Sequence, residues 1–230
     1  MSGKTAKMAR QMAFDLPTNV RLGAADFFVS DANTLAYVLM QTPQTWSNNN
    51  LAIIGPAGSG KTHLARVFAA QSGATIINAK DVRADTDLPN SNVVLEDGDA
   101  LHTDGEEWLF HVYNALSRAG FFLLLTSRLP PARWDIALPD LASRLSTITS
   151  VTIDDPDDPL LTAVLLKHFA DRQLAPTPNA VAFLMKHLPR SFNAVRRIVD
   201  TLDREALAQS KPLTRPFVRA VLDSMPHDEG

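Results

Sequence analysis

The sequence has 230 residues, 45% of them hydrophobic and 20% charged, which is the composition of an ordinary globular protein. The formal net charge of −3 argues against a dedicated nucleic-acid-binding protein, and the lack of cysteine excludes a disulfide framework, a thiolate metal site and a cysteine nucleophile. With no signal-peptide core and no apolar run long enough to span a bilayer, we expect a cytoplasmic protein without membrane contact.

Residues 1–17 are expected to form a flexible N-terminal tail, because residues 1–10 are small, basic and polar. Within the tail, residues 11–16 (QMAFDL) carry apolar side chains at alternating positions, and Pro17 ends the segment. Such a segment can bind a partner's surface in extended form, or it can lie on its own domain as a first strand. The residues alone favour the second alternative.

The strongest pattern in the chain is a phosphate loop. Residues 51–54 predict a short buried strand, and residues 55–62 (GPAGSGKT) follow it directly and open a helix, as the pattern G-x-x-x-x-G-K-[ST] requires. Lys61 would reach the β- and γ-phosphates of a nucleotide, and the Thr62 hydroxyl would bind Mg²⁺. The predicted nucleotide-binding residues of the loop are Gly55, Pro56, Ala57, Gly58, Ser59, Gly60, Lys61 and Thr62.

Four more buried strands are expected, and helices alternate with them. The strands are expected over residues 74–77, 92–95, 121–126 and 148–153. This alternation predicts an α/β fold for residues 18–153, with a five-stranded parallel sheet and helices on both faces. A ligand should then lie beyond the carboxyl ends of the strands.

The composition changes at residues 154–159 (DDPDDP), an acidic and proline-broken stretch that indicates a hinge. Beyond it no strand pattern remains, and four segments have apolar residues at helical spacing. We therefore predict a small α-helical domain over residues 154–226, followed by a short C-terminal tail, residues 227–230.

Polar side chains at the predicted ligand edge extend the candidate site. Glu96 and Asp97 end the third strand, where one could serve the water shell of Mg²⁺ and the other could orient an attacking water; the alternative is a solvated acidic turn. Ser127 ends the fourth strand, where it could sense the γ-phosphate. Arg144 could stabilise charge developing on a phosphate of its own chain or of a neighbour, or it could be an ordinary surface arginine.

Arg190, Asn193 and Arg197 are spaced at i, i+3 and i+7, so they share one face of a predicted helix in the second domain. This face could close over a nucleotide, or it could simply be solvated. His63 follows Thr62 in the sequence, and the residues alone indicate packing or a polar network rather than catalysis for its side chain.

An α/β nucleotide module followed by a small helical lid resembles the AAA+ superfamily, over roughly residues 18–225. Residues 58–64 (GSGKTHL) are similar to the phosphate loop of the replication initiator DnaA, which places His63 beside the nucleotide-binding set. Residues 125–131 (LTSRLPP) resemble that family's sensor I segment. Residues 141–145 (LASRL) resemble its box VII, in which Arg144 matches the arginine finger.

The chain ends where DnaA would continue into a DNA-binding domain, and residues 11–16 are similar to Q-x-x-x-x-L peptides that bind the DNA polymerase sliding clamp. Together these features resemble the Hda family, in its alphaproteobacterial form. The resemblance implies ADP or ATP with Mg²⁺ held by Thr62 and Glu96. It also implies self-association, no more than weak DNA contact, and negative regulation of initiation through hydrolysis of DnaA-bound ATP, completed by Arg144. The implied clamp-binding residues are Gln11, Met12, Phe14 and Leu16.

Three departures from the DnaA pattern imply that the chain's own ATPase activity is weak or absent. Glu96 and Asp97 replace a pair of aspartates, Arg128 replaces the sensor I acid, and Asn193 stands at the sensor II position, where Arg190 or Arg197 could substitute. The alternatives are an autonomous AAA+ ATPase of the helicase-loader or transposase-helper type, and a non-catalytic clamp adaptor.

Overall fold

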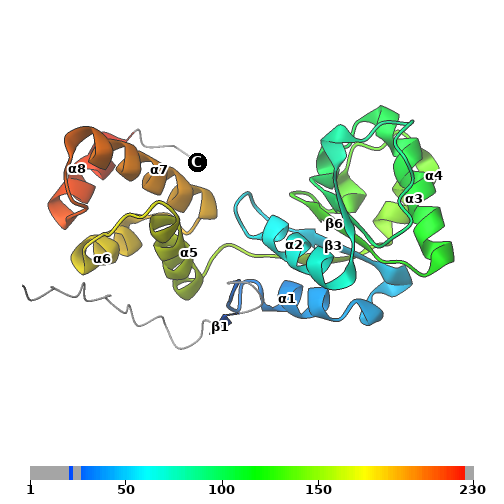
Figure 1. Cartoon of the computed structure of the whole chain (residues 1–230), viewed down its shortest axis with the longest axis horizontal. Helices are drawn as coiled ribbons and strands as arrows, with labels where there is room; N and C mark the ends of the chain where they lie inside the picture. Colours follow the sequence, from blue (N-terminus) through cyan, green and yellow to red (C-terminus); the bar gives the residue numbers. More distant parts are fainter. Residues whose placement is uncertain (1–20, 23–26, 226–230) are drawn as a thin grey trace, which may run out of the picture.

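The computed structural model describes residues 21–22 and 27–225. Figure 1 shows two parts, a module built on a sheet and a bundle of helices at one end of it. The predicted clamp-binding segment, residues 11–16, and the predicted tail, residues 227–230, lie outside the described residues. Within the described ranges, every helix is too short or too polar to cross a membrane.

The central sheet confirms the prediction of five parallel strands, in the order β4-β5-β6-β3-β7. β3 and β6 are buried at every position, as expected for inner strands that are covered on both faces. A separate antiparallel pair precedes the sheet. The strands are β1 (Arg21–Leu22), β2 (Phe28–Val29), β3 (Asn50–Ile54), β4 (Thr75–Asn78), β5 (Val93–Glu96), β6 (Leu123–Ser127) and β7 (Thr149–Thr152).

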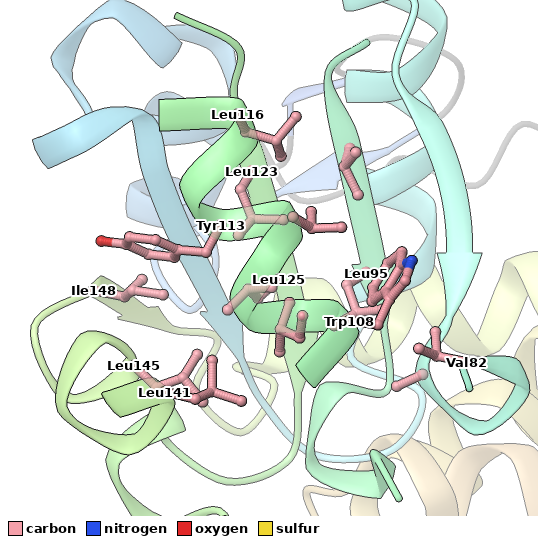
Figure 2. Packing of buried hydrophobic residues seen from close by; sticks show 14 of the residues in the cluster. Val82, Leu95, Trp108, Tyr113, Leu116, Leu123, Leu125, Leu141, Leu145 and Ile148 are labelled. Carbon is pink, nitrogen blue, oxygen red and sulfur yellow. The ribbon is translucent and has the colours of Figure 1, made fainter. Parts of the chain in front are cut away.

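Helices cover both faces of the sheet, and alternate residues of β3 point to opposite faces. Leu51 and Ile53 pack with α1 (Thr34–Gln41) and α2 (Lys61–Ser72). Ala52 packs in the cluster that holds α3 (Glu106–Ala119) and α4 (Pro139–Ser146) on the other face. Figure 2 shows this second cluster, in which Trp108 of α3 lies near Leu95 of β5. The short 3₁₀ turns are η2 (Pro43–Thr45), η3 (Ser47–Asn49), η4 (Ala79–Asp81), η5 (Gly98–Ala100), η6 (Thr103–Gly105) and η7 (Pro131–Arg133).

The lid is a bundle of α5 (Asp158–Asp171), α6 (Pro178–His187), α7 (Phe192–Gln209) and α8 (Arg215–Ser224), which confirms the predicted helical domain after the sheet. Side chains cap the first three lid helices, because the Asp157, Thr177 and Ser191 side-chain oxygens each accept a backbone N–H of the first turn. The bundle has its own apolar core, which includes Leu161, Leu165, Phe169, Val195, Ile198 and Val218.

Candidate nucleotide site

The phosphate loop between β3 and α2 has a backbone that suits glycine. Gly58 and Gly60 have positive φ values of 83° and 95°. A Cβ on Gly60 would lie 2.9 Å from Cε2 of Phe27, and one on Gly58 would lie 3.2 Å from Cβ of Phe192. The loop is therefore enclosed by Phe27, the residue before β2, on one side and by the start of lid helix α7 on the other.

Lys61 begins α2 and is 8% exposed. Its Nζ donates to the carbonyl oxygens of Gly55 (2.7 Å) and Pro56 (2.9 Å). Burial lowers the pKa of Lys61, the nearby Arg128 lowers it further, and Asp97 and Asp99 oppose both effects. The loop therefore holds a buried cation at the point where an anion would be stabilised.

Other groups of the loop also fit a phosphate. Ser59 is only 3% exposed, and its buried Oγ has no hydrogen-bond partner among the described residues. Thr62 is exposed in the first turn of α2, at the positive end of that helix. An unsatisfied buried hydroxyl and open helix N–H groups are what a bound phosphate would engage.

The strand ends next to the loop carry the predicted acids. Within the part of the chain that the structure describes, the buried Oε1 of Glu96 has no hydrogen-bond partner, whereas the carboxylate of Asp97 turns to Lys80, 3.8 Å away. Asp97 has a φ of 53°, so the two neighbouring side chains diverge. Among the described residues no group of three or more histidines and acids could hold a metal alone. Thr62 and Glu96 fit Mg²⁺, which takes most of its ligands from phosphates and water.

At the tip of β6, Ser127 is fully buried and its Oγ donates to the carbonyl of Leu129 (2.7 Å). Arg128 is exposed, and its backbone N–H donates to Asp99 Oδ2 (3.2 Å). The Ser127 hydroxyl, predicted to sense the γ-phosphate, thus forms a hydrogen bond within the turn that follows β6. Of the residues at this tip, Arg128 is the one whose charge lowers the pKa of Lys61.

A cavity of about 170 Å³ adjoins the phosphate loop, between the sheet module and the lid. Its walls are mostly apolar and aromatic, and the ring of Phe27 lies 5.5 Å from that of His63 and 5.9 Å from that of Tyr37. Burial lowers the pKa of His168 in the lid wall, and Arg172 lowers it further. The cavity is lined by Phe27, Phe28, Asn33, Gly58, Ser59, Gly60, His63, Leu160, Val164, Lys167, His168 and Phe192.

The lid contributes different residues from those predicted. Arg190, Asn193 and Arg197 are exposed and are not among the residues that line the cavity. Arg190 instead pairs with Asp158 (3.0 Å), which joins the segment just before α7 to the start of α5. The lid wall comes from α5 and from Phe192. No sequence pattern predicts this wall, because the apolar periodicity of α5 indicates only that the helix is packed.

Arg144 lies in the last turn of α4, which leads directly into β7. β7 runs parallel to β3, and its first residue, Thr149, pairs with Leu51 at the amino end of the sheet. The phosphate loop begins at Gly55, about 13 Å of strand further on. The structure therefore places Arg144 near the opposite end of the sheet from its own phosphate loop. Figure 1 shows α3 and α4 at the end of the molecule away from the lid.

Comparisons with known proteins agree with this architecture. Residues 158–222 match the family model of the Hda lid domain. A relative from Haemophilus influenzae, described only as an uncharacterized protein, is 29% identical over 188 residues, which is 74% of this chain and 80% of that protein.

Two solved DnaA structures share the fold. Domain III of Thermotoga maritima DnaA superimposes with a TM-score of 0.67 at 18% identity, over 86% of this chain and 93% of that chain. AMPPCP-bound DnaA from Aquifex aeolicus gives a TM-score of 0.60 at 17% identity, over 86% of this chain and 71% of that one. The chain therefore has the fold of DnaA domain III, and its lid matches the Hda lid domain, which confirms the predicted fold.

Proposed function

We propose that this chain, a DnaA-related AAA+ protein with an Hda-type lid, is a negative regulator of replication initiation. In this role it stimulates hydrolysis of ATP bound to DnaA, and Arg144 acts in trans on that nucleotide. The observation that carries the proposal is the place of Arg144, near the opposite end of the sheet from its own phosphate loop. An arginine finger in that position serves a phosphate on another molecule.

The surroundings of Arg144 support this role. Its guanidinium lies over the rings of Phe110 and Tyr113 and, among the described residues, no carboxylate forms an ion pair with it. The guanidinium N–H groups are thus available, and their planar fork matches the oxygens of a phosphate. Charge that develops on a partner's γ-phosphate would be stabilised by such a group.

The chain's own nucleotide, ADP or ATP, has a structural role in this proposal. The phosphate loop would hold its phosphates through Lys61 and Ser59, with Mg²⁺ at Thr62 and Glu96. The ion would neutralise phosphate charge. The adjoining cavity, lined by both the sheet module and the lid, would hold the rest of the nucleotide and so fix the lid. The DnaA relative of this fold that binds AMPPCP supports this assignment.

In the proposed mechanism, the N-terminal segment brings the protein to the sliding clamp. Gln11, Met12, Phe14 and Leu16 would bind the sliding clamp on DNA, which brings Arg144 to DnaA. The protein would then contact DNA mainly through the clamp, in the cytoplasm. Self-association through the face that meets DnaA would compete with this activity.

Hydrolysis of DnaA-bound ATP in the presence of the full chain tests the proposal. We expect the wild-type chain to accelerate hydrolysis when the sliding clamp is loaded on DNA, and Gln11→Ala to lose most of this stimulation. Gln44→Ala, which changes an exposed glutamine of the sheet module, is the matched control and should behave as wild type. A wild-type chain that leaves hydrolysis unchanged with loaded clamp and nucleotide present would show that the proposal is wrong.

The unpartnered Glu96 oxygen beside the loop favours a second candidate, an autonomous AAA+ ATPase. That candidate predicts appreciable ATP hydrolysis by the chain alone, and loss of it in Glu96→Gln. The proposal made above predicts little hydrolysis without DnaA in either form. Steady-state phosphate release from the purified chain separates the two.

A further inference from the structure

We infer that helix α3 positions the arginine finger, with Phe110 and Tyr113 as positioning residues for the guanidinium of Arg144. The inference rests on the function proposed above for Arg144 and adds how the side chain is held before DnaA arrives. Phe110 and Tyr113 are spaced at i and i+3, so their rings lie next to each other on one face of α3. The Cζ of Arg144 lies 5.0 Å from the centre of the Phe110 ring and 5.3 Å from that of Tyr113.

The two rings differ in how firmly they are held. Tyr113 is 7% exposed and packs in the core cluster together with Leu141, Leu145 and Ile148. Figure 2 shows its ring above Ile148, with Leu145 and Leu141 of α4 below. Phe110 is partly buried at the edge of the same cluster. Tyr113 therefore supplies a fixed surface, and Phe110 is the ring that can be changed without opening the core.

A contact with ring faces suits a finger better than an ion pair would. The ring attracts the cation through its π-electron density and does not use the N–H groups in the guanidinium plane. Other arginines of this chain pair with aspartates, as Arg172 does with Asp200 and Arg219 with Asp223. A carboxylate at Arg144 would occupy the donors that a phosphate needs. The aromatic pair holds the side chain and does not use those donors, which form no ion pair with any described residue.

The same helix also fixes the start of α4. Glu106, in the first turn of α3, is 3% exposed, and its two carboxylate oxygens accept the backbone N–H groups of Ala137 (3.1 Å) and Leu138 (2.7 Å). Pro139 follows at the first helical position. α3 therefore holds α4 at its beginning and holds the Arg144 side chain near its end.

Holding the side chain in advance should raise the maximal rate of stimulated hydrolysis. We expect Phe110→Leu to lower the maximal stimulated rate about two- to fivefold, the factor by which a partly exposed cation–π contact of this kind changes an equilibrium. The chain concentration for half-maximal stimulation should stay unchanged, because DnaA binding does not require the ring. Phe110→Tyr restores the ring and should restore the rate. Phe121→Leu removes a ring from the same cluster without touching Arg144, and is the matched control.

Nuclear magnetic resonance of the full chain, labelled at arginine, gives a readout that does not involve DnaA. Protons of the Arg144 side chain should be shifted upfield by the two rings in the wild type, shifted less in Phe110→Leu, and shifted as in the wild type in Phe121→Leu. Arg144 protons at ordinary positions in the wild type, or unmoved by Phe110→Leu, would overturn the inference.

The outcomes separate this inference from the proposed function. If Arg144→Ala abolishes stimulation but Phe110→Leu keeps the full maximal rate, the positioning role is wrong and the proposed function stands. If Arg144→Ala leaves stimulation intact, the proposed function is wrong, and the role of α3 in the reaction is rejected with it. A Phe110→Leu variant that lowers rate and affinity together with its melting temperature shows a structural role only, and this also overturns the inference.

Discussion

At the scale of single residues, Lys61 is a buried cation that donates to two carbonyl oxygens of its own loop. Burial lowers its pKa in the absence of a ligand, and Arg128 adds to that effect. A phosphate beside the ammonium favours the charged form and so raises the same pKa. Nucleotide binding and protonation of Lys61 are therefore linked.

The sign of this linkage gives the first prediction. Nucleotide affinity is highest while Lys61 is protonated. It falls as the pH rises through the pKa that Lys61 has in the nucleotide-free protein. Because that pKa is lowered, affinity is lost below the ordinary lysine value of 10.5. Titrations of a fluorescent ADP analogue from neutral pH to about pH 10 measure it. Lys61→Met should bind weakly at every pH. An affinity that stays constant for the wild type over this range would contradict the prediction.

The second prediction concerns Gly60, whose φ of 95° and approach to Phe27 both require glycine. Gly73 also has a positive φ, of 67°, but a Cβ there would meet nothing within 4 Å. Both Gly60→Ala and Gly73→Ala should lower the free energy of unfolding by about 1–2 kcal/mol. Only Gly60→Ala should also weaken nucleotide binding. Denaturant unfolding and nucleotide titration of the two variants check this, and equal nucleotide affinity in both would count against it.

At the scale of elements, the contact between α3 and α4 decides where Arg144 lies. The sequence pattern predicts helices over residues 104–118 and 138–145, and the observed helices agree closely with these ranges. Glu106, however, is 31 residues away in sequence from the first backbone N–H that it accepts. Apolar periodicity reports which face of a helix is buried and carries no information about such a long-range polar contact.

The third prediction follows from that contact. Glu106→Ala leaves two backbone N–H groups without their acceptors and should destabilise the protein by about 1–3 kcal/mol for each group. Glu107 is the neighbouring acid in the same turn and is exposed, so Glu107→Ala should change stability by no more than about 0.5 kcal/mol. Thermal unfolding of both variants is the measurement. Equal stabilities of the two variants would show that Glu106 does not hold α4.

The phosphate loop, the sheet and the lid could be predicted from sequence because each depends on a local pattern or on periodicity. The cavity could not be predicted, since Phe27 of the sheet module and His168 and Phe192 of the lid come from three distant segments and meet only in the folded chain. The helical register predicted for Asn193 and Arg197 is correct on α7, but Arg190 precedes that helix, which begins at Phe192 after the N-cap Ser191. Nothing in that register indicates that Arg190 pairs with Asp158 of α5.

At the scale of the whole molecule, the nucleotide cavity joins the two parts of the chain. Its lining comes from β2, the phosphate loop and the lid helices α5 and α7. Outside this region each part has its own apolar core. A bound nucleotide should therefore stabilise the arrangement of the lid on the sheet module.

The fourth prediction is that ADP stabilises the entire chain. At a concentration of about 100 times Kd, binding adds about 2.7 kcal/mol, which should raise Tm by about 5–10 °C for a protein of this size. Differential scanning calorimetry with and without ADP measures the shift. Lys61→Met should show little of it. A wild-type chain whose Tm is unchanged at saturating ADP would contradict the nucleotide site.

In the proposed mechanism, Arg144 acts on ATP bound to another protein. The most direct test of this role is the single-turnover hydrolysis of ATP prebound to DnaA, with loaded clamp and the full chain at saturating concentration. Arg118, an exposed arginine on α3, supplies the matched control. We predict that Arg144→Ala returns the hydrolysis rate to that of DnaA alone, while Arg118→Ala stimulates as well as the wild type. Full stimulation by Arg144→Ala would show that Arg144 is not the arginine finger, and it would favour a non-catalytic clamp adaptor.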